Sequence, residues 1–405
     1  MRSNRAPPPS DAMSQTAVVE QGRPPFWRDV RVLRVAGQAL FVVLVLLVGR
    51  EIWLNLVFGV ERQGIDLSWD FLRERAGFGI KEGIDYSANA TVTRALLVAF
   101  VNTVIVASAG IVLATIFGLL IGIGRLSPNW LVRKVTQVYV EIFRNTPVLV
   151  TIIFFYFGVV LALPLIGGGG ILGVAYVSNR GAAIPWPSIS EGAGVWGLLV
   201  LAAAVAATLV ARWRRRVNER TGEPHHRVLW WLGTFLGLGA VAYALTGAPV
   251  VIDAPDQVGR GYVGGIQISG ELFGVLAGLV IYTSAFIAEI VRGSILAVDK
   301  GQKEASEALG LTSFQQMRFV VLPQAMRIAI PPINSQYLNL TKNTSLGLAV
   351  AYPELVSVGS TIINQKGRFT QVLVIWMLSY LTLSLLISLV MNILNRVVAY
   401  RGERG

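Results

Sequence analysis

The chain has 405 residues, of which 54% are hydrophobic and only 14% are charged, a balance that excludes an ordinary soluble domain. Its formal net charge is +12 at pH 7, but the Lys and Arg residues lie between long apolar runs, which indicates a membrane protein obeying the positive-inside rule rather than a nucleic-acid-binding protein. It contains no cysteine and only two histidines, His225 and His226, which argues against disulfides, thiolate metal sites and histidine metal clusters.

The N-terminal part is predicted to be a cytoplasmic tail, a membrane span and a periplasmic loop. Residues 1–35 are polar and rich in Pro and Arg; a signal peptide is the alternative, but the apolar run begins too late and no small-residue cleavage site follows it. Within residues 36–93, the run from Gly37 to Val57 is long enough to cross a bilayer, for which about 20 residues are needed. In the mixed-charge loop after it, four aromatic residues suggest packing on the membrane surface: Trp69, Phe71, Phe78 and Tyr86.

Residues 94–163 are predicted to begin the transmembrane core. A span from Arg94 to Gly124 precedes three basic residues that we expect in the cytoplasm, Arg125, Arg133 and Lys134. A third span should follow, with Thr146 as its N-cap and Pro147 at its first helical position.

Residues 164–270 are predicted to hold an exterior loop and two further spans. The loop contains Gly167 to Gly170 and the stiff Pro185-Trp186-Pro187, and the spans run from about Val195 to Ala211 and from Val228 to Thr246. The hairpin between these spans is the most basic segment of the chain. Nucleic-acid binding is one interpretation of it, and a cytoplasmic anchor near anionic lipid headgroups is the one that we prefer.

The next predicted span runs from Glu271 to Val291 and opens a second part of the core, residues 271–396. It carries Glu289 near its inner end, and an acidic side chain inside lipid costs about 2.5 to 3.5 kcal/mol. We therefore expect Glu289 at the membrane interface, paired with Arg292 at i+3. A proton-relay role is the alternative.

The segment from Asp299 to Pro323 is charged, lies between two apolar runs and is predicted to form two short amphipathic helices with a bend between them. In the first helix, Ala305, Ala308 and Leu309 share one face. The opposite, wet face holds two i,i+4 pairs, Lys300 with Glu304 and Lys303 with Glu307. Gly310 is expected to end this helix in the left-handed backbone region.

The second helix of this segment is predicted to start immediately after Gly310. Thr312 with Gln315, or Ser313 with Gln316, offers the spacing of a capping box. Its apolar face would consist of Phe314, Met317 and Val321, and Pro323 is expected to end it.

The string Glu304-Ala305-Ser306, followed by Gly310 and by Leu322-Pro323, resembles the EAA loop of the membrane subunits of ATP-binding-cassette importers. In that family the bent helix pair is a coupling helix, which lies in a groove on the cytoplasmic ATPase and carries its motion to the membrane. Ser306 in place of a second Ala is a small-for-small departure. The resemblance implies that six residues of the segment 299–323 couple this chain to an ATPase: Glu304, Ala305, Ser306, Gly310, Leu322 and Pro323. A cytoplasmic loop folded on the bilayer surface is the alternative.

A second resemblance lies before the third span. The string from Tyr139 to Pro147 resembles the Tyr-Val-Glu-x-x-Arg-Gly-Thr-Pro signature of permeases in the polar amino acid uptake branch of these importers. Asn145 replaces the Gly, a minor departure because Asn tolerates the same backbone region. Relative to that family's five-span core, residues 164–270 are an insertion. Together with the long N-terminal extension, this insertion resembles the larger permease subunit of the general L-amino acid transporters of Gram-negative bacteria.

A span from near Met326 to Ala351 is predicted to be interrupted by Pro331-Pro332 in its first half, and it is the most polar segment that has to cross the membrane. A Lys at this depth needs a watery or protein-lined face. We place candidate cargo contacts at Asn339, Lys342, Asn343, Thr344 and Ser345, with Lys342 suited to face a substrate carboxylate. The alternative, of equal weight, is that these residues bond only to a partner permease or to neighbouring helices.

After this segment the sequence predicts an exterior stretch from Tyr352 to Arg368, a last span from about Val372 to Asn395 and a cytoplasmic tail, residues 397–405. The chain is then an all-α polytopic membrane protein with about eight spans and both termini in the cytoplasm. The resemblance implies a type I importer permease core that carries a two-helix insertion.

The resemblance further implies a permease of the bacterial inner membrane that moves L-amino acids from the periplasm to the cytoplasm. The implied partners are a second related permease, a homodimeric cytoplasmic ATPase, a periplasmic amino-acid-binding protein and membrane lipid, without nucleic acid. The sequence has no G-x-x-x-x-G-K-[ST] phosphate loop, so ATP and Mg are expected on the ATPase, and no cofactor, metal or catalytic residue is expected in this chain. The glycine pairs Gly122/Gly124 and Gly237/Gly239 are attributed to close helix packing.

Two other classes of protein remain as alternatives. An ion-coupled secondary amino acid carrier would need an acid pair or broken helices in repeated halves, and the sequence displays neither. A membrane enzyme would need ionisable groups clustered at one bilayer depth, which the spacing of the charged residues does not provide.

Overall fold

The computed structural model describes residues 30–62, 68–165, 175–189, 193–221, 226–247, 250–259 and 261–399. The chain divides into two compact units, and helix α1 (Val30–Arg62) belongs to the first. This helix contains the predicted first span, and its stretch from Leu33 to Gly59 is long and apolar enough to cross a membrane. Most of the predicted N-terminal tail, the end of the C-terminal tail and Gly167 to Gly170 lie outside the described residues.

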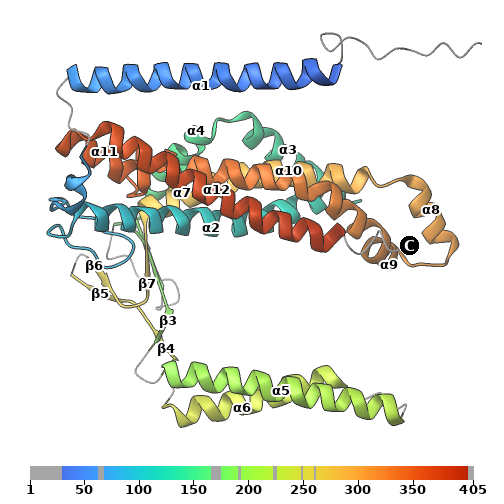
Figure 1. Cartoon of the computed structure of the whole chain (residues 1–405). Coiled ribbons are helices and arrows are strands. Elements are labelled where there is room, and N and C mark those ends of the chain that lie inside the picture. The colour runs from blue at the N-terminus through green and yellow to red at the C-terminus, as the bar shows by residue number, and fades with distance from the viewer. Residues whose placement is uncertain are drawn as a thin grey trace, which may run out of the picture. The chain divides into compact units, whose positions relative to one another are not determined.

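The second unit begins at Trp69 and is mainly helical (Figure 1). Its longer helices are α2 (Val92–Gly124), α3 (Trp130–Asn145), α5 (Ala193–Thr221), α6 (Arg227–Leu245), α7 (Gly270–Leu296), α10 (Leu322–Asn343), α11 (Leu355–Lys366) and α12 (Phe369–Ala399). Its shorter helical elements are η1 (Asp70–Arg73), α4 (Val148–Ile153), η2 (Phe154–Val160), α8 (Lys300–Ala308), α9 (Ser313–Gln316), η3 (Met317–Val321) and η4 (Thr344–Val350).

Among the described residues, six helices are long and apolar enough to span a membrane, or up to eight spans if two bent helix pairs are each counted as one. The first pair joins Trp130–Asn145 to Val148–Val160 at 110°, and the second joins Ser313–Val350 to Leu355–Lys366 at 52°. The predicted all-α polytopic fold with about eight spans is therefore confirmed.

Helices α2 and α7 pack closely because glycines remove side chains where the two helices meet. A Cβ atom on Gly118 would lie 2.6 Å from Cβ of Ile287, and one on Gly122 would lie 2.8 Å from the carbonyl oxygen of Ala288. The packing role predicted for Gly122 is thus confirmed, and so is that of Gly124, where a Cβ would lie 2.8 Å from Cγ2 of Thr136 in α3. It is wrong within the described chain for Gly237 and Gly239, because a Cβ at either position would meet no described atom within 4 Å.

The bend between α3 and α4 lies at Thr146 and Pro147, one residue from the predicted helix start. Thr146 is not an N-cap: its hydroxyl donates to the carbonyl oxygen of Ile142 at 2.8 Å, within the preceding helix. Pro147 occupies the N-cap position instead, with φ −58° and ψ 137°. The reason is local, since a proline pushes the residue before it into extended backbone, and Thr146 has ψ 132°.

Seven short strands, which the sequence analysis did not predict, lie before α7. They are β1 (Tyr176–Ser178), β2 (Gly181–Ile184), β3 (Trp186–Ile189), β4 (Val250–Asp253), β5 (Asp256–Val258), β6 (Gly261–Val263) and β7 (Ile266–Ser269). All pairings are antiparallel, in a three-stranded sheet of order β1-β2-β7, a hairpin of β5 and β6, and a pair of β3 and β4, which flank the α5–α6 helix pair in the chain. Because β2 pairs with β7, an early part of the predicted insertion lies beside its last residues, directly before α7.

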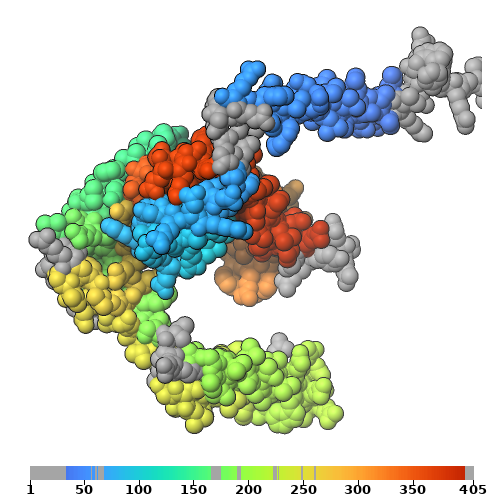
Figure 2. Space-filling model, turned by 60° about the vertical axis from the view of Figure 1, so that its left-hand side comes forward, coloured from blue at the N-terminus to red at the C-terminus, as the bar shows by residue number. Residues whose placement is uncertain are grey.

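The loop before α2 packs in part on the protein itself, which corrects the prediction for Phe71, whereas Trp69 is 47% exposed. Phe71 is fully buried in a cluster with residues of α2 and with Leu355, Val358 and Ile362 of α11. In Figure 2 the light blue atoms of this part of the chain lie against the red atoms of the C-terminal helices. The stretch from Tyr352 to Arg368 therefore forms a packed helix, because its apolar residues have partners distant in the sequence.

Candidate functional site

The segment predicted to couple the chain to an ATPase forms the expected bent pair of helices, at the end of α7 opposite to the strands (Figure 1). Asp299 caps α8 by accepting a hydrogen bond from the backbone N–H of Gly301 at 2.6 Å. Gly310 follows α8 in left-handed backbone, with φ +74°. Thr312 and Gln315 then form the capping box of α9, each side chain accepting from the other residue's backbone N–H. The predictions for Gly310 and for the capping box are confirmed, and the cap at Asp299 is an addition of the structure.

The bend is closed by a hydrogen-bonded contact between Ser306 and Gln316. Ser306 is only 2% exposed, and its hydroxyl donates to the carbonyl oxygen of Lys303 at 2.6 Å. Nε2 of Gln316 donates both to that oxygen and to Oγ of Ser306, each at 2.8 Å. The departure from the EAA pattern at Ser306 thus supplies a hydroxyl that links α8 to α9, since alanine has no such group.

Much of the apolar surface of this segment is exposed. Leu309 is 80% exposed, Phe314 71% and Phe319 62%. Of the predicted face of the second helix, only Val321 is buried, against residues of α2, α7 and α10. Of the rest of that face, Phe314 is largely exposed and Met317 is 42% exposed. A soluble loop rarely leaves large apolar side chains so exposed without a binding partner or a membrane to cover them.

Two details of this segment differ from the prediction. The Lys300–Glu304 and Lys303–Glu307 ion pairs do not form in the described structure, because exposed Lys–Glu pairs gain little in water. Pro323 does not end the helix either: it lies in the first turn of α10, directly after the π-helical turn η3. Proline is tolerated in a first turn, and the wider turn before it makes room for the ring.

At the inner end of α7, Glu289 lies between two arginines. Nη2 of Arg292 lies 2.5 Å from Oε1 of Glu289, and Nη1 of Arg125, directly after α2, forms a salt bridge with Oε2. The predicted pairing with Arg292 is confirmed, and Arg125 is a partner that the sequence did not suggest. Burial lowers the pKa of the Arg125 guanidinium, nearby Arg292 and Arg144 lower it further, and Glu141 opposes them.

The polar crossing segment is divided between two environments. Ser335, Asn339 and Lys342 are all exposed and lie at i, i+4 and i+7, so they form a polar stripe on one face of α10. Thr344 is fully buried and donates to the carbonyl oxygen of Thr341 at 2.8 Å. Asn343 and Ser345 are half-buried. The helix also continues through Pro331 and Pro332, contrary to the predicted interruption, since α10 packs against α7 and α12.

The signature before the third span places a tyrosine against α7. The hydroxyl of Tyr139 donates to the carbonyl oxygen of Ile281 at 3.0 Å and lies 2.7 Å from Oγ of Ser284. In the same helix Arg144 lies over the ring of Phe286, 5.4 Å from its centroid. These residues hold the bent helix pair to α7. The signature in the sequence included Tyr139 and Arg144, but nothing in the sequence predicted their contacts with α7.

The coupling segment, the ion cluster and the polar stripe all fall within residues 110–401, which match the family of binding-protein-dependent transport system inner membrane components. The chain belongs to this family. It is therefore a transport permease of the inner membrane with several spans. The resemblance to amino acid ABC importer permeases that the sequence motifs indicated is confirmed.

Three relatives resemble this permease over most of its length. The general L-amino acid transport system permease protein AapQ of Rhizobium johnstonii is 44% identical, covering 88% of this chain and 90% of the relative. The putative amino-acid ABC transporter permease protein YhdX of Escherichia coli K12 is 41% identical, covering 89% and 93%. The glutamate/glutamine/aspartate/asparagine transport system permease protein BztB of Rhodobacter capsulatus is 37% identical, covering 88% and 92%.

Proposed function

We propose that this permease moves L-amino acids from the periplasm to the cytoplasm and that a separate ATPase drives it through α8 and α9. The relatives are named as amino acid permeases, which supports the cargo class. The main support for coupling is the exposed apolar surface of Leu309, Phe314 and Phe319, which suits a groove on another protein. The hydrogen bond between Ser306 and Gln316 holds the two helices that present this surface. The basic residues that flank the spans favour an orientation with this surface and both termini in the cytoplasm.

The complete importer in this proposal contains a second related permease, a homodimeric ATPase that holds ATP and Mg, and a periplasmic amino-acid-binding protein. Closure of the ATPase dimer moves α8 and α9. Because α8 follows α7 after a short link, this motion passes to α7 and, through Glu289, to the end of α2. The two permeases then rock from inward-open to outward-open, and the binding protein releases its amino acid into the cavity between them.

The coupling proposal is tested by the double substitution Glu304→Lys with Gly310→Val. Valine at φ +74° strains the backbone, and lysine reverses the charge of an exposed residue in α8. We expect co-purification of the ATPase and amino acid uptake to fall at least about tenfold, which corresponds to about 1.4 kcal/mol of binding. The substitution Glu219→Lys, which reverses the charge of an exposed acidic residue in α5 outside the coupling segment, is the control.

The native complex should lose uptake with vanadate but not with a protonophore. If uptake and ATPase binding both survive the double substitution, α8 and α9 do not couple this permease to its energy source.

We further propose that the stripe of Ser335, Asn339 and Lys342 lines the cargo path, and that Lys342 faces the substrate carboxylate. Its exposure on α10 within a segment that crosses the membrane supports a watery face there. Lys342→Met should therefore lower the rate of uptake at least about tenfold with little loss of assembled complex, since removing a charged hydrogen bond costs about 1.5–3 kcal/mol. Lys134→Met, at another exposed lysine, should change neither. Equal losses of uptake and assembly would instead assign Lys342 to packing against the partner permease.

A further inference from the structure

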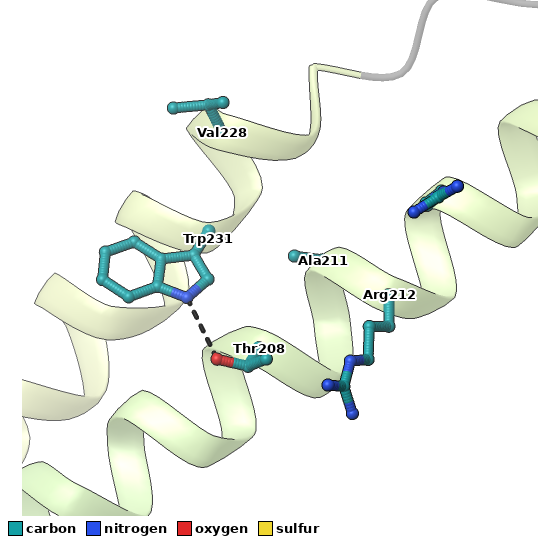
Figure 3. Close-up of a pocket in the computed structure, with 6 residues that line it drawn as sticks. Thr208, Ala211, Arg212, Val228 and Trp231 are labelled. Atoms are coloured by element: carbon teal, nitrogen blue, oxygen red, sulfur yellow. Dashed lines mark hydrogen bonds between the residues drawn. The ribbon is translucent and has the colours of Figure 1, made fainter. Parts of the chain in front are cut away.

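A cavity of about 340 Å³ opens between α5 and α6, at the end of this helix pair where its apolar stretches meet the basic hairpin. Its lining residues are Thr208, Ala211, Arg212, Arg215, Val228 and Trp231. Figure 3 shows Trp231 reaching from α6 toward α5, where its Nε1 donates to Oγ1 of Thr208 at 3.3 Å. This hydrogen bond fixes the indole as one wall of the cavity.

Aromatic and arginine side chains place the cavity at the boundary of the membrane. The guanidinium of Arg214 lies 3.9 Å from the ring centroid of Trp230 and 5.0 Å from that of Trp213. Tryptophan gathers where the hydrocarbon of a bilayer gives way to the headgroups. The apolar run of α5 ends at Ala211 and that of α6 begins at Val228, both in the wall of the cavity, so the cavity faces the headgroup region.

The positive charge of the cavity comes from two lining residues of α5, Arg212 and Arg215. Arg212 has no ion-pair partner within the described part of the chain. Arg215 contacts Glu219 at 2.9 Å, but both side chains are well exposed, and such a pair exchanges readily for a stronger anion. A phosphate accepts paired hydrogen bonds from guanidinium groups. The remaining wall, formed by Ala211, Val228 and the ring of Trp231, is apolar.

We propose that this cavity binds an anionic phospholipid, with its phosphate between Arg212 and Arg215 and its glycerol and upper acyl carbons against Ala211, Val228 and Trp231. A free phosphate would use the arginines alone and leave the apolar wall exposed to water. A bound lipid covers both parts of the cavity and fixes the depth of the α5–α6 pair in the bilayer. This cavity shares no residue with the coupling segment or with the proposed cargo path.

The test measures lipid retention by native mass spectrometry on the full-length permease complex, purified in detergent. Phosphatidylglycerol is compared with phosphatidylcholine of the same acyl chains. We expect the wild type to retain phosphatidylglycerol at least about tenfold more tightly, because each basic residue near the headgroups contributes about 1 kcal/mol. Arg212→Gln with Arg215→Gln should remove this preference.

Two further variants separate the cavity from the general basic surface. Arg216→Gln with Arg220→Gln removes the same charge outside the cavity and should keep the preference. Ala211→Phe fills the cavity, keeps every charge and should lose it. Equal losses in the two double variants, or retained phosphatidylglycerol in Ala211→Phe, would overturn the proposal. So would displacement of the lipid by millimolar inorganic phosphate, which would indicate a phosphate site.

Discussion

The substitution Gly278→Ala is expected to disrupt the packing of α4 on α7 and to reduce the amount of assembled permease severalfold. A Cβ at Gly278 would lie 2.6 Å from Cγ1, 2.7 Å from Cα and 2.9 Å from the backbone nitrogen of Ile152. Two of these atoms belong to the backbone, so a change of rotamer does not relieve the clash and α4 has to move. Overpacking costs about 1–3 kcal/mol even where side chains give way. We expect the apparent unfolding temperature to fall by a few degrees, because the shift per kcal/mol becomes smaller as the chain becomes longer.

The matched control is Gly293→Ala in the same helix. Gly293 is exposed, and a Cβ there would meet no atom within 4 Å. Alanine should be neutral or stabilising by up to about 1 kcal/mol, because it favours helix more than glycine does. Thermal unfolding followed by size-exclusion chromatography measures both variants. If Gly278→Ala unfolds at the same temperature as Gly293→Ala, the close approach of α4 and α7 is wrong.

The substitution Glu289→Gln is expected to destabilise the permease and to separate the inner ends of α2 and α7. It leaves Arg125 and Arg292 together without the carboxylate that holds them, and their side chains are only 15% and 30% exposed. Removing one partner of a buried ion pair costs about 3–5 kcal/mol. Partial exposure of these side chains reduces the expected loss to about 2 kcal/mol, seen as a lower unfolding temperature and less transport.

A second substitution shows whether Glu289→Gln destabilises the permease through unbalanced charge or through altered packing. Adding Arg125→Gln to Glu289→Gln removes one uncompensated guanidinium and should restore part of the stability, which a double-mutant cycle measures. Glu219→Gln breaks an exposed Arg–Glu pair in α5 and should have little effect. Wild-type stability of Glu289→Gln would contradict the structural role of the cluster. A pH-dependent loss of transport in a stable variant would favour the proton-relay alternative.

Sequence reasoning succeeded where a residue acts on its own neighbours. Gly310 ends α8, Thr312 with Gln315 starts α9, and Arg292 pairs with Glu289 one turn away. It failed by one residue at Thr146 because two local rules compete there, the preference of threonine for helix starts and the extended backbone before proline.

Sequence reasoning could not supply contacts that depend on the path of the chain. Gln316 was a plausible capping residue, but the bend brings it to Ser306 instead. Arg125 meets Glu289 only because α2 lies beside α7. Gly122 and Gly237 have the same kind of sequence context, yet only the first lies against another helix. The sequence likewise gave no hint that Phe71 would be buried by α11 rather than by lipid.

The sequence by itself determined the approximate positions of the spans and of the bent coupling segment, because hydropathy, capping and backbone preferences act over a few residues. Only the tertiary structure decided which faces are buried and which are left for partners. It buried Thr344 and Ser306, and it left Lys342, Leu309 and Phe314 exposed. The physical reason is that burial depends on contacts between segments far apart in the chain, and a local pattern of polar and apolar residues does not specify which segment will cover which face.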